Sequence, residues 1–163
     1  MNIIIKKRFL LYKDYKLRCC IGKSGLSNAK KEGDLKTPKG KFKLGMIYYR
    51  KDKIKSLICK LQKKTIKKNM GWCDDPSSSK YNQEVKLPYK YKTEKLYRKN
   101  SIYDILINIK YNQSPAIKNN GSAIFLHLTN KKYKATKGCI SILKRDLLKI
   151  LPMINKRTKI LIK

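Results

Sequence analysis

Acidic residues are scarce in this chain, and several features that define common protein classes are absent. Asp and Glu together number 10 against 42 Lys and Arg, giving a formal net charge of +32. No apolar run approaches the roughly 20 residues that cross a bilayer, which excludes a membrane-spanning helix. No heptad or longer repeat recurs, which excludes a coiled coil or solenoid. Hydrophobic residues still make up 41% of the chain, enough for a core, so a disordered basic tail is also excluded.

The cysteines form no recognisable metal or disulfide pattern. The five are Cys19, Cys20, Cys59, Cys73 and Cys139. Because C-x-x-C occurs nowhere, the sequence offers no zinc-ribbon or thioredoxin-like site. The odd number leaves at least one thiol free. The apolar run at the start of the chain is too short for the h-region of a signal peptide, so the chain is expected to be unprocessed.

The positive charge has two interpretations. A potential of this sign attracts nucleic acid, anionic membranes or acidic wall polymers. Lys, Ile, Asn and Tyr, which all have A/T-rich codons, are also abundant, and this indicates compositional drift. The lysines are spread along the whole chain, whereas a nucleic-acid footprint is usually clustered. We favour drift and expect no nucleic-acid partner.

The first half of the chain is predicted to form short strands separated by turns. Residues 3–12 are predicted to form an opening hairpin, and residues 17–21 another short strand. Residues 33–40 are rich in turn formers, including Pro38. From 42 to 48, apolar residues alternate with lysines, which predicts a strand with one buried face. Residues 50–69 show no clear period.

The second half continues this pattern and contains the only predicted helix. Residues 71–88 are predicted to form a long polar loop leading into a strand near its end. Residues 105–111 alternate as a half-buried strand, and 122–128 form an apolar run typical of a strand buried on both faces. A helical stripe over 143–154 follows, and 159–162 form a last strand. We therefore predict a mainly β protein with one core, a single domain over 1–163.

Two residues stand out as reactive. His127 is the only histidine and ends the most apolar strand, where a lone histidine is more often a satisfied core residue. Twelve residues later, Cys139 follows Gly138 just before the predicted helix. A helix N-terminus and the nearby Lys137 would both favour the thiolate. A strand-end His beside a loop Cys is the minimum requirement for thiol acyl transfer.

Several motifs in the same order resemble the YkuD-type L,D-transpeptidases. They are TKGC at 136–139 with His127 upstream, EGDLKTPKGKF at 32–42, and the segments 71–88 and 111–127. The likeness runs from about residue 16 to the C-terminus and points to a compact subgroup of that family. Together the motifs are far more specific than any one of them.

The resemblance implies a β-sandwich-like catalytic domain, with one helix after the catalytic cysteine, that remodels peptidoglycan. Cys139 would attack a stem-peptide carbonyl, expel the terminal D-Ala and form a thioester, which an amine resolves as a 3→3 cross-link. His127 would be the general base, and Gly138 and Cys139 would supply oxyanion-hole amides. No metal and no cofactor are implied. The protein is expected to act as a monomer on peptidoglycan stem peptides.

The chain departs from the family pattern at two positions. Lys137 replaces a second histidine, and Ser141 replaces the usual Asn or Arg, which affects substrate placement more than chemistry. Trp72 could line the substrate cleft or pack in the core. Asp74 and Asp75 are expected to stabilise a loop through side-chain hydrogen bonds to its backbone. The predicted substrate-binding residues are Thr136, Lys137, Ser141, Trp72, Tyr81, Asn82 and Asn112.

Three alternatives to transpeptidation remain open at this point. An L,D-carboxypeptidase would use water in place of the amine. A basic module would bind polyanions, and a degenerate wall-binding domain would bind stem peptides without turnover. The substrate places the protein in the cell envelope or periplasm, whereas the lack of a visible signal peptide leaves a cytoplasmic location open.

Overall fold

Short β-strands make up most of the regular structure in the computed structural model, which describes residues 1–163. The elements are β1 (Ile3–Lys6), β2 (Phe9–Tyr12), β3 (Tyr15–Cys20), β4 (Leu26–Ser27), β5 (Thr37–Pro38), β6 (Gly40–Tyr49), β7 (Lys63–Thr65), β8 (Met70–Cys73), β9 (Glu84–Lys86), β10 (Thr93–Lys95), β11 (Ile105–Ile109), β12 (Phe125–Thr129), β13 (Ile140–Leu143), α1 (Lys144–Ile150), the 3₁₀ helix η1 (Leu151–Met153) and β14 (Lys159–Ile162). The predicted mainly β fold, with its one α-helix in the C-terminal part of the chain beyond Cys139, is confirmed.

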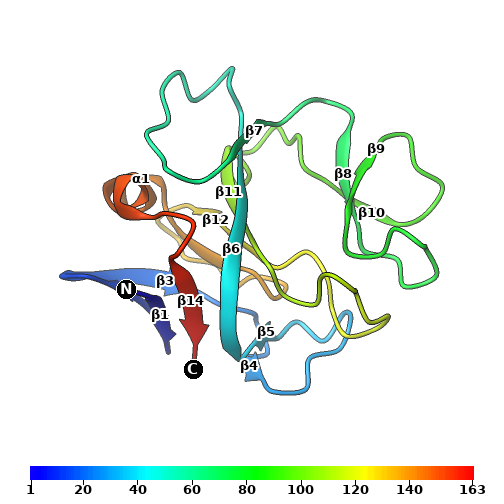
Figure 1. Ribbon diagram of the computed structural model, residues 1–163, viewed down its shortest axis with the longest axis horizontal. Helices are drawn as coiled ribbons and strands as arrows, with labels where there is room; N and C mark the ends of the chain where they lie inside the picture. Colours follow the sequence, from blue (N-terminus) through cyan, green and yellow to red (C-terminus); the bar gives the residue numbers. More distant parts are fainter.

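The long strand β6 closes the main sheet on itself. The strand order is β11-β12-β13-β3-β2-β1-β14-β6-β7, and β6 also pairs with β11. Residues 40–43 of β6 pair with β14, and residues 44–49 pair with β11. In Figure 1 this strand runs through the middle of the molecule between the two halves of the sheet. A sheet closed in this way surrounds the apolar side chains on its inner face and shields them from water.

The larger core lies inside this closed sheet. It contains 24 buried residues, and the isoleucines of β1, β11 and β14 alternate into it. The helix α1 adds Leu147 and Ile150, both fully buried, as the stripe in its sequence predicts. Burial of this apolar area is the main force that holds the strands in register.

A smaller core lies on the opposite face of β11 and β12. Leu126 and Leu128 point into the larger core, so the alternation of side chains sends Phe125 and His127 to the other side. There Phe125 packs edge-on against Trp72 of β8, with ring centroids 5.1 Å apart. A three-stranded sheet, β10-β8-β9, contributes to this second layer. The lone histidine therefore lies between the two layers.

The opening hairpin over 3–12, the strands at 17–21, 42–48 and 105–111 and the last strand are confirmed. The predicted burial of two of them is wrong. The strand at 105–109 is buried on both faces, and the strand at 42–48 sends Leu44 into the larger core and Tyr48 into the smaller one.

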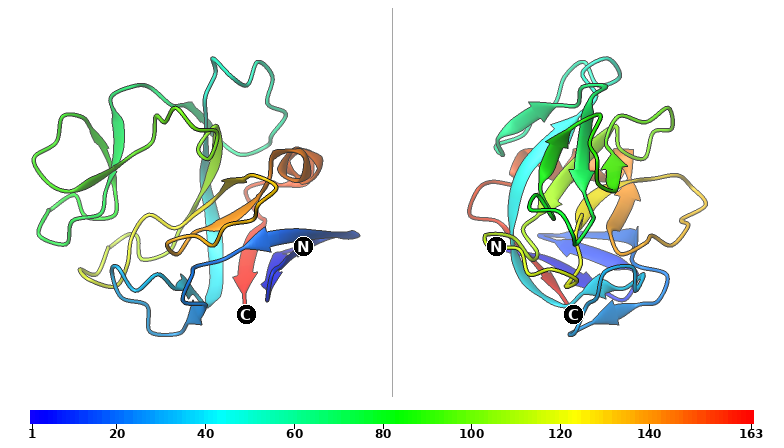
Figure 2. Two further views of the ribbon diagram at one scale, coloured as in Figure 1. Left: turned by 180° about the vertical axis from the view of Figure 1, so that it is seen from behind. Right: turned by 90° about the vertical axis from the view of Figure 1, so that its right-hand side faces the viewer.

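Three further predictions need correction. Residues 71–73, predicted to begin a polar loop, belong to the buried strand β8. The run 122–128 becomes a strand only from Phe125, because Ala123 has a positive φ of 51°. Cys139 is followed by β13, not by the helix. Seen from behind, this orange strand lies between β12 and the blue β3 (Figure 2).

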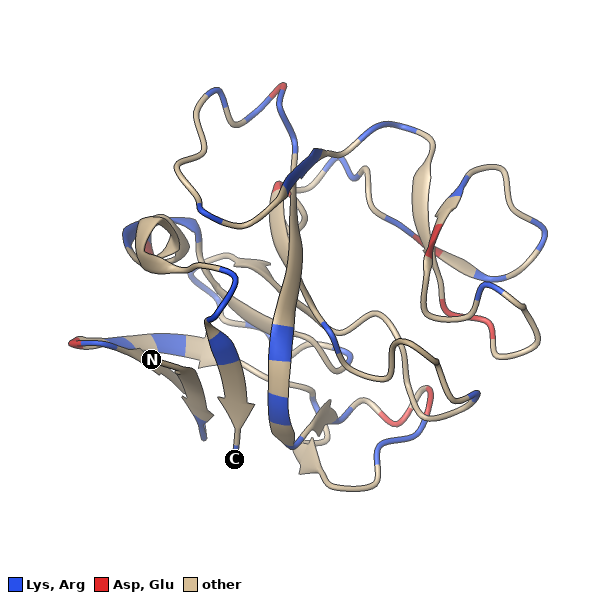
Figure 3. Cartoon of the chain, viewed as in Figure 1, with Lys and Arg blue, Asp and Glu red and all other residues tan.

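Lysine and arginine lie on loops and strands throughout the chain. Figure 3 shows them along β6, β14 and most connecting segments, with few acidic positions among them. No helix of the structure combines the length and apolar character needed to cross a membrane. No group of three or more His, Cys, Asp or Glu side chains is arranged to hold a metal ion.

Candidate active site

His127 and Cys139 lie on neighbouring chain segments and face the same side of the sheet. The parallel pairing of β12 with β13 sets Leu126 opposite Ile140 and His127 opposite Ser141. Cys139, one residue before β13, lies beside Phe125, whose N–H donates to the sulfur over 3.4 Å. Phe125 and His127 share a face because side chains alternate along a strand. The fold thus brings together the two residues that the sequence singled out.

The imidazole of His127 is buried and has a defined tautomer. Its Nδ1 lies 2.9 Å from the carbonyl oxygen of Leu128, which can only accept a hydrogen bond. Nδ1 must therefore carry the proton, which leaves Nε2 with a free lone pair. The pKa of His127 is lowered to about 4, mainly by burial and to a smaller extent by the positive charge of Arg98. The imidazole is neutral and available as a base, and a backbone carbonyl orients it.

The thiol of Cys139 is protonated in this arrangement. Its Sγ donates a hydrogen bond to the carbonyl oxygen of Ala123 over 3.1 Å. Burial raises the pKa of Cys139 to about 12, and the negative charge of Glu94 acts in the same direction. Because β13 separates Cys139 from α1, the predicted helix N-terminal effect on this thiol is wrong. The cations that lower its pKa are Lys30 and Arg98.

Thr37 connects the two most distinctive sequence motifs. Its fully buried hydroxyl accepts from Gly22 N over 2.8 Å and donates to the carbonyl oxygen of Gly138 over 2.8 Å. The hydroxyl of Thr136 donates to the carbonyl oxygen of Cys139 and accepts from Gly138 N over 3.2 Å. Thr37, from the first half of the chain, therefore fixes the carbonyl group of Gly138, and Thr136, from the second half, fixes that of Cys139.

Gly138 occupies a position where a side chain does not fit. Its φ is +138°, and a Cβ there would lie 2.9 Å from the backbone oxygen of Lys36. The glycine thus allows the cysteine loop to approach the Thr37 segment closely. The Gly138 amide is occupied by the Thr136 hydroxyl, so its part in an oxyanion hole stays a prediction.

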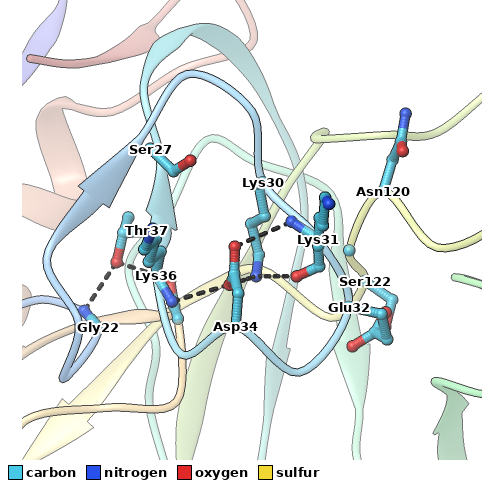
Figure 4. Close-up of polar contacts among 12 residues, drawn as sticks. Gly22, Ser27, Lys30, Lys31, Glu32, Asp34, Lys36, Thr37, Asn120 and Ser122 are labelled. Atoms are coloured by element: carbon cyan, nitrogen blue, oxygen red, sulfur yellow. Dashed lines mark hydrogen bonds and ion pairs between the residues drawn. The ribbon is translucent and has the colours of Figure 1, made fainter.

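A compact loop over residues 28–36 packs against the same region (Figure 4). Lys30, with a side chain only 4% exposed, forms an ion pair of 2.7 Å with Asp34 and packs against Gly121. Asp34 also accepts from the amides of Lys31 and Lys36. These bonds place the buried ammonium group of Lys30 close to the cysteine loop: a Cβ added at Gly138 would lie 3.6 Å from its Nζ.

Glu32 ties this loop to the segment before β12. Its carboxylate accepts from the hydroxyls of Tyr81 and Ser122, the latter over 2.7 Å. Ser122 precedes the strand that carries His127. The loop therefore supports both segments of the site.

Four predicted substrate-binding residues have structural partners here. Asn82 accepts from Trp72 Nε1 over 2.9 Å and from Ala123 N over 3.0 Å, and donates to the carbonyls of Tyr111 and Asn112. Asn112 bonds in turn to the backbone of its own loop. Trp72 and Tyr81 are buried, and with Asn82 they line a cavity of about 440 Å³. Their contact with substrate stays a prediction.

The other predicted contacts differ in exposure. Lys137 is exposed, Thr136 is half-buried, and Ser141 is buried with no hydrogen-bond partner for its hydroxyl. Asp75 accepts from Ser77 and from the amide of Lys92, which confirms that it holds a loop. All five cysteines are free thiols.

Sequence reasoning missed the side chains that cover the histidine. The ring of Tyr103 meets His127 nearly edge-on with centroids 5.2 Å apart, and its hydroxyl bonds to Glu94. Arg98 lies above the Tyr103 ring at 4.2 Å. None of the three belongs to a motif, and no local pattern marks them, because only the packing of the second layer brings them to β12.

Acidification is expected to destabilise the protein through His127. Between its ordinary pKa of 6.5 and its value of about 4 in the fold, the unfolded chain binds a proton that the folded chain does not. The free energy of unfolding should therefore fall as the pH drops through this window, by up to about 3 kcal/mol. Denaturant titrations of the wild type and His127→Gln across this range would measure the effect. Equal pH slopes for the two proteins would contradict it.

Comparisons with known proteins place this chain in a family. The model of the L,D-transpeptidase catalytic domain (YkuD) matches residues 3–162. No curated protein sequence gives a significant match. Among solved structures, the helical cell shape determining protein Pgp2 from Campylobacter jejuni matches with a TM-score of 0.54 and 16% identity, over 99% of this chain and 46% of Pgp2. The chain thus spans less than half the length of that protein, and the likeness concerns the fold. By its family match over nearly every residue, the chain belongs to the YkuD L,D-transpeptidase catalytic domain family.

Proposed function

We propose that residues 1–163 form a catalytic domain that acts as an L,D-transpeptidase on peptidoglycan stem peptides, with Cys139 as nucleophile and His127 as general base. The observation that carries this proposal is the geometry of the pair. A protonated thiol and a neutral imidazole with a free Nε2 lie on one face of adjacent chain segments. A neutral imidazole can activate a cysteine that is still protonated before substrate binds, because it accepts the thiol proton during the attack.

The proposed reaction has two halves, acylation of Cys139 and transfer of the acyl group to an amine. Sγ of Cys139 attacks the carbonyl carbon before the terminal D-Ala, and its proton passes to Nε2 of His127. The tetrahedral intermediate collapses, the C–N bond breaks, and the imidazolium returns the proton to the departing amine. A thioester remains on Cys139. The amine of a second stem then attacks it, loses a proton to His127, and releases the cysteine as a thiol.

Two roles inside this reaction depend on the loop around Cys139. Backbone amides near the sulfur would stabilise the oxyanion, a contribution of about 3–4 kcal/mol per donor in other acyl-transfer enzymes. The amides of Gly138 and Cys139 are our candidates. Thr37 and Thr136 hold the peptides on either side of these amides, so they act as positioning residues.

The L,D-carboxypeptidase alternative shares the first half of the reaction. Water would resolve the thioester in place of the amine, and His127 would take its proton in the same way. Lys137 and Ser141 replace the family's usual residues; Lys137 is exposed and could contact an acceptor, whereas Ser141 is buried. The two activities therefore differ only in the acceptor that resolves the thioester, which is an amine in one and water in the other.

A polyanion-binding function has one observation in its favour. A cavity of about 660 Å³ between β7 and β9 is lined by four lysines, Lys63, Lys64, Lys67 and Lys86, and by one carboxylate, Glu84, which pairs with Lys64. Neither Cys139 nor His127 lines it. Such binding would weaken steeply with salt and survive Cys139→Ala, because phosphate contacts dominate it.

The test of the proposed function is incubation with a disaccharide-free tetrapeptide stem, with and without a second stem as acceptor. Mass spectrometry should detect released D-Ala and a cross-linked dimer. Release of D-Ala with tripeptide as the only other product would assign the carboxypeptidase. No release of D-Ala under either condition would overturn the acyl-transfer proposal.

The substrate places the proposed activity in the cell envelope. Pgp2, which shares the fold, is described as a helical cell shape determining protein. A wall-remodelling role for this chain would fit that description and the positive charge, since peptidoglycan carries carboxylates. Cell fractionation should recover the protein with the envelope, and recovery in the cytosol alone would contradict this location.

A further inference from the structure

We propose that Tyr103, anchored by Glu94 and Arg98, is a positioning residue that fixes the imidazole of His127 and shields it from water. This inference rests on the proposed function only in treating His127 as the base. The contacts themselves do not depend on the substrate. Tyr103, Glu94 and Arg98 belong to the second layer of the fold and lie outside the sequence motifs.

The contact between the two rings is direct. The ring centroids of Tyr103 and His127 are 5.2 Å apart at an interplanar angle of 70°. Tyr103 is 4% exposed and also meets Phe125 edge-on at 6.1 Å. Aromatic pairs in this geometry attract one another, so the tyrosine holds the imidazole as well as covering it.

The anchor of Tyr103 is a shared carboxylate oxygen. Oε1 of Glu94 accepts from the Tyr103 hydroxyl over 2.7 Å and from Nη2 of Arg98 over 2.7 Å. The Arg98 guanidinium lies 4.2 Å from the centre of the Tyr103 ring. Its own Nε donates to the carbonyl oxygen of Lys95 over 3.0 Å. The ring is therefore held at its hydroxyl and on its face at once.

The surroundings of His127 explain why this cover matters. The titratable and charged groups around it are Tyr103, Arg98 and Glu94 from the second layer, Cys139 before β13, and Cys20 of β3 opposite Ser141. Only Arg98 among them carries a positive charge, and it disfavours imidazolium. Removing the ring would admit water, and water stabilises imidazolium.

The Glu94–Arg98 pair favours a neutral resting site from both sides. Positive Arg98 lowers the pKa of His127. Arg98 also lowers the pKa of Cys139, but negative Glu94 raises that pKa by more, so the pair as a whole raises it. Both effects oppose a thiolate–imidazolium pair before substrate binds. The proton transfer is thus left to the attack on the carbonyl.

The single histidine makes a direct test possible. Its ring resonances can be followed by NMR titration without assignment, and the readout needs no turnover. The pKa should be about 4 in the wild type. In Tyr103→Leu we expect it to rise by about one unit or more toward 6.5, because the imidazole gains hydration. A carbapenem, an acylating inhibitor of this family, gives a second readout. The pH at which its reaction with Cys139 falls to half the maximal rate should rise together with the pKa of His127.

A matched control is Tyr12, which is also buried and whose hydroxyl donates to the carbonyl oxygen of Met153 over 3.0 Å, in the larger core. Tyr12→Leu should leave the titration of His127 unchanged. If Tyr103→Leu does not fold, Tyr103→Phe and Tyr12→Phe replace the pair. Tyr103→Phe loses only the Glu94 anchor and should raise the pKa less, in the same direction.

Glu94→Gln is the conservative variant. Its amide oxygen can still accept from the Tyr103 hydroxyl, so the ring stays anchored and the pKa of His127 should not rise, whereas Glu94→Leu loses the anchor and should raise the pKa through hydration. An unchanged pKa in Tyr103→Leu, or an equal rise in Tyr12→Leu, would overturn the inference. A failure of the peptidoglycan proposal would appear as absent turnover with the NMR shifts intact, so the two failures are distinguishable.

Discussion

Cys139→Ala is expected to abolish covalent reaction with a carbapenem, an acylating inhibitor of this family. The wild type should gain one inhibitor mass in an intact mass spectrum, and the variant none. The reason is that the sulfur of Cys139 contacts the amide of Phe125, which shares a face of β12 with His127. In the proposed reaction the imidazole of His127 takes the thiol proton. With its pKa raised to about 12, the thiol has little reactivity without that base.

Cys59→Ala is the matched control for this experiment. Cys59 is half-buried like Cys139, its pKa is also raised by burial, and it packs against the larger core, whereas His127 packs against Tyr103 of the smaller core. It should acylate as the wild type does. An adduct that persists in Cys139→Ala, or disappears in Cys59→Ala, would contradict the assignment of the nucleophile. Because Cys139→Ala removes only one sulfur from a half-buried position, circular dichroism should show an intact fold.

Gly138→Ala is expected to slow acylation by about 100-fold or more, since misplacing reacting groups by about 1 Å costs this much. A Cβ at this position would lie 2.9 Å from the backbone oxygen of Lys36, and φ is +138°. The cysteine loop must therefore move away from the Thr37 segment. The backbone strain should also lower the free energy of unfolding by about 1–3 kcal/mol.

Gly33→Ala separates the two causes of this effect. Gly33 also has a positive φ, +76°, but an added Cβ there meets nothing within 4 Å. It should lose stability from backbone strain and keep its rate of acylation. Kinetics of carbapenem acylation and thermal unfolding of both variants measure the two effects. Wild-type acylation in Gly138→Ala would mean that the close approach to Lys36 does not position the nucleophile.

Local patterns in the sequence were sufficient for most strands. Alternating apolar residues marked β6 and β11, and the short apolar runs marked β1, β2 and β14. These features depend on neighbouring residues and on which face is buried, so they can be read along the chain. The strand β13 was missed, because its four residues merge with the helical stripe that follows, and pairing with β12 decides its conformation.

In the site, too, the residues could be identified from the sequence but their contacts could not. His127, Cys139 and the Thr37 segment were identified from the sequence, partly through the family resemblance. Their hydrogen bonds were not, because Thr37 and Gly138 are 101 residues apart along the chain. The predicted thiolate was wrong for a related reason. Its basis was the helix expected directly after Cys139, whereas burial and Glu94 decide the pKa of the thiol in the folded protein.

The sequence by itself determined the mainly β class, the reactive pair and the family. Only the tertiary structure decided the protonation of that pair and the cover provided by Tyr103, Glu94 and Arg98. The physical reason is that strand alternation is a local property of the chain. Burial, hydrogen bonding and the distance between charges arise only when distant segments pack together, and these are the quantities that set a pKa.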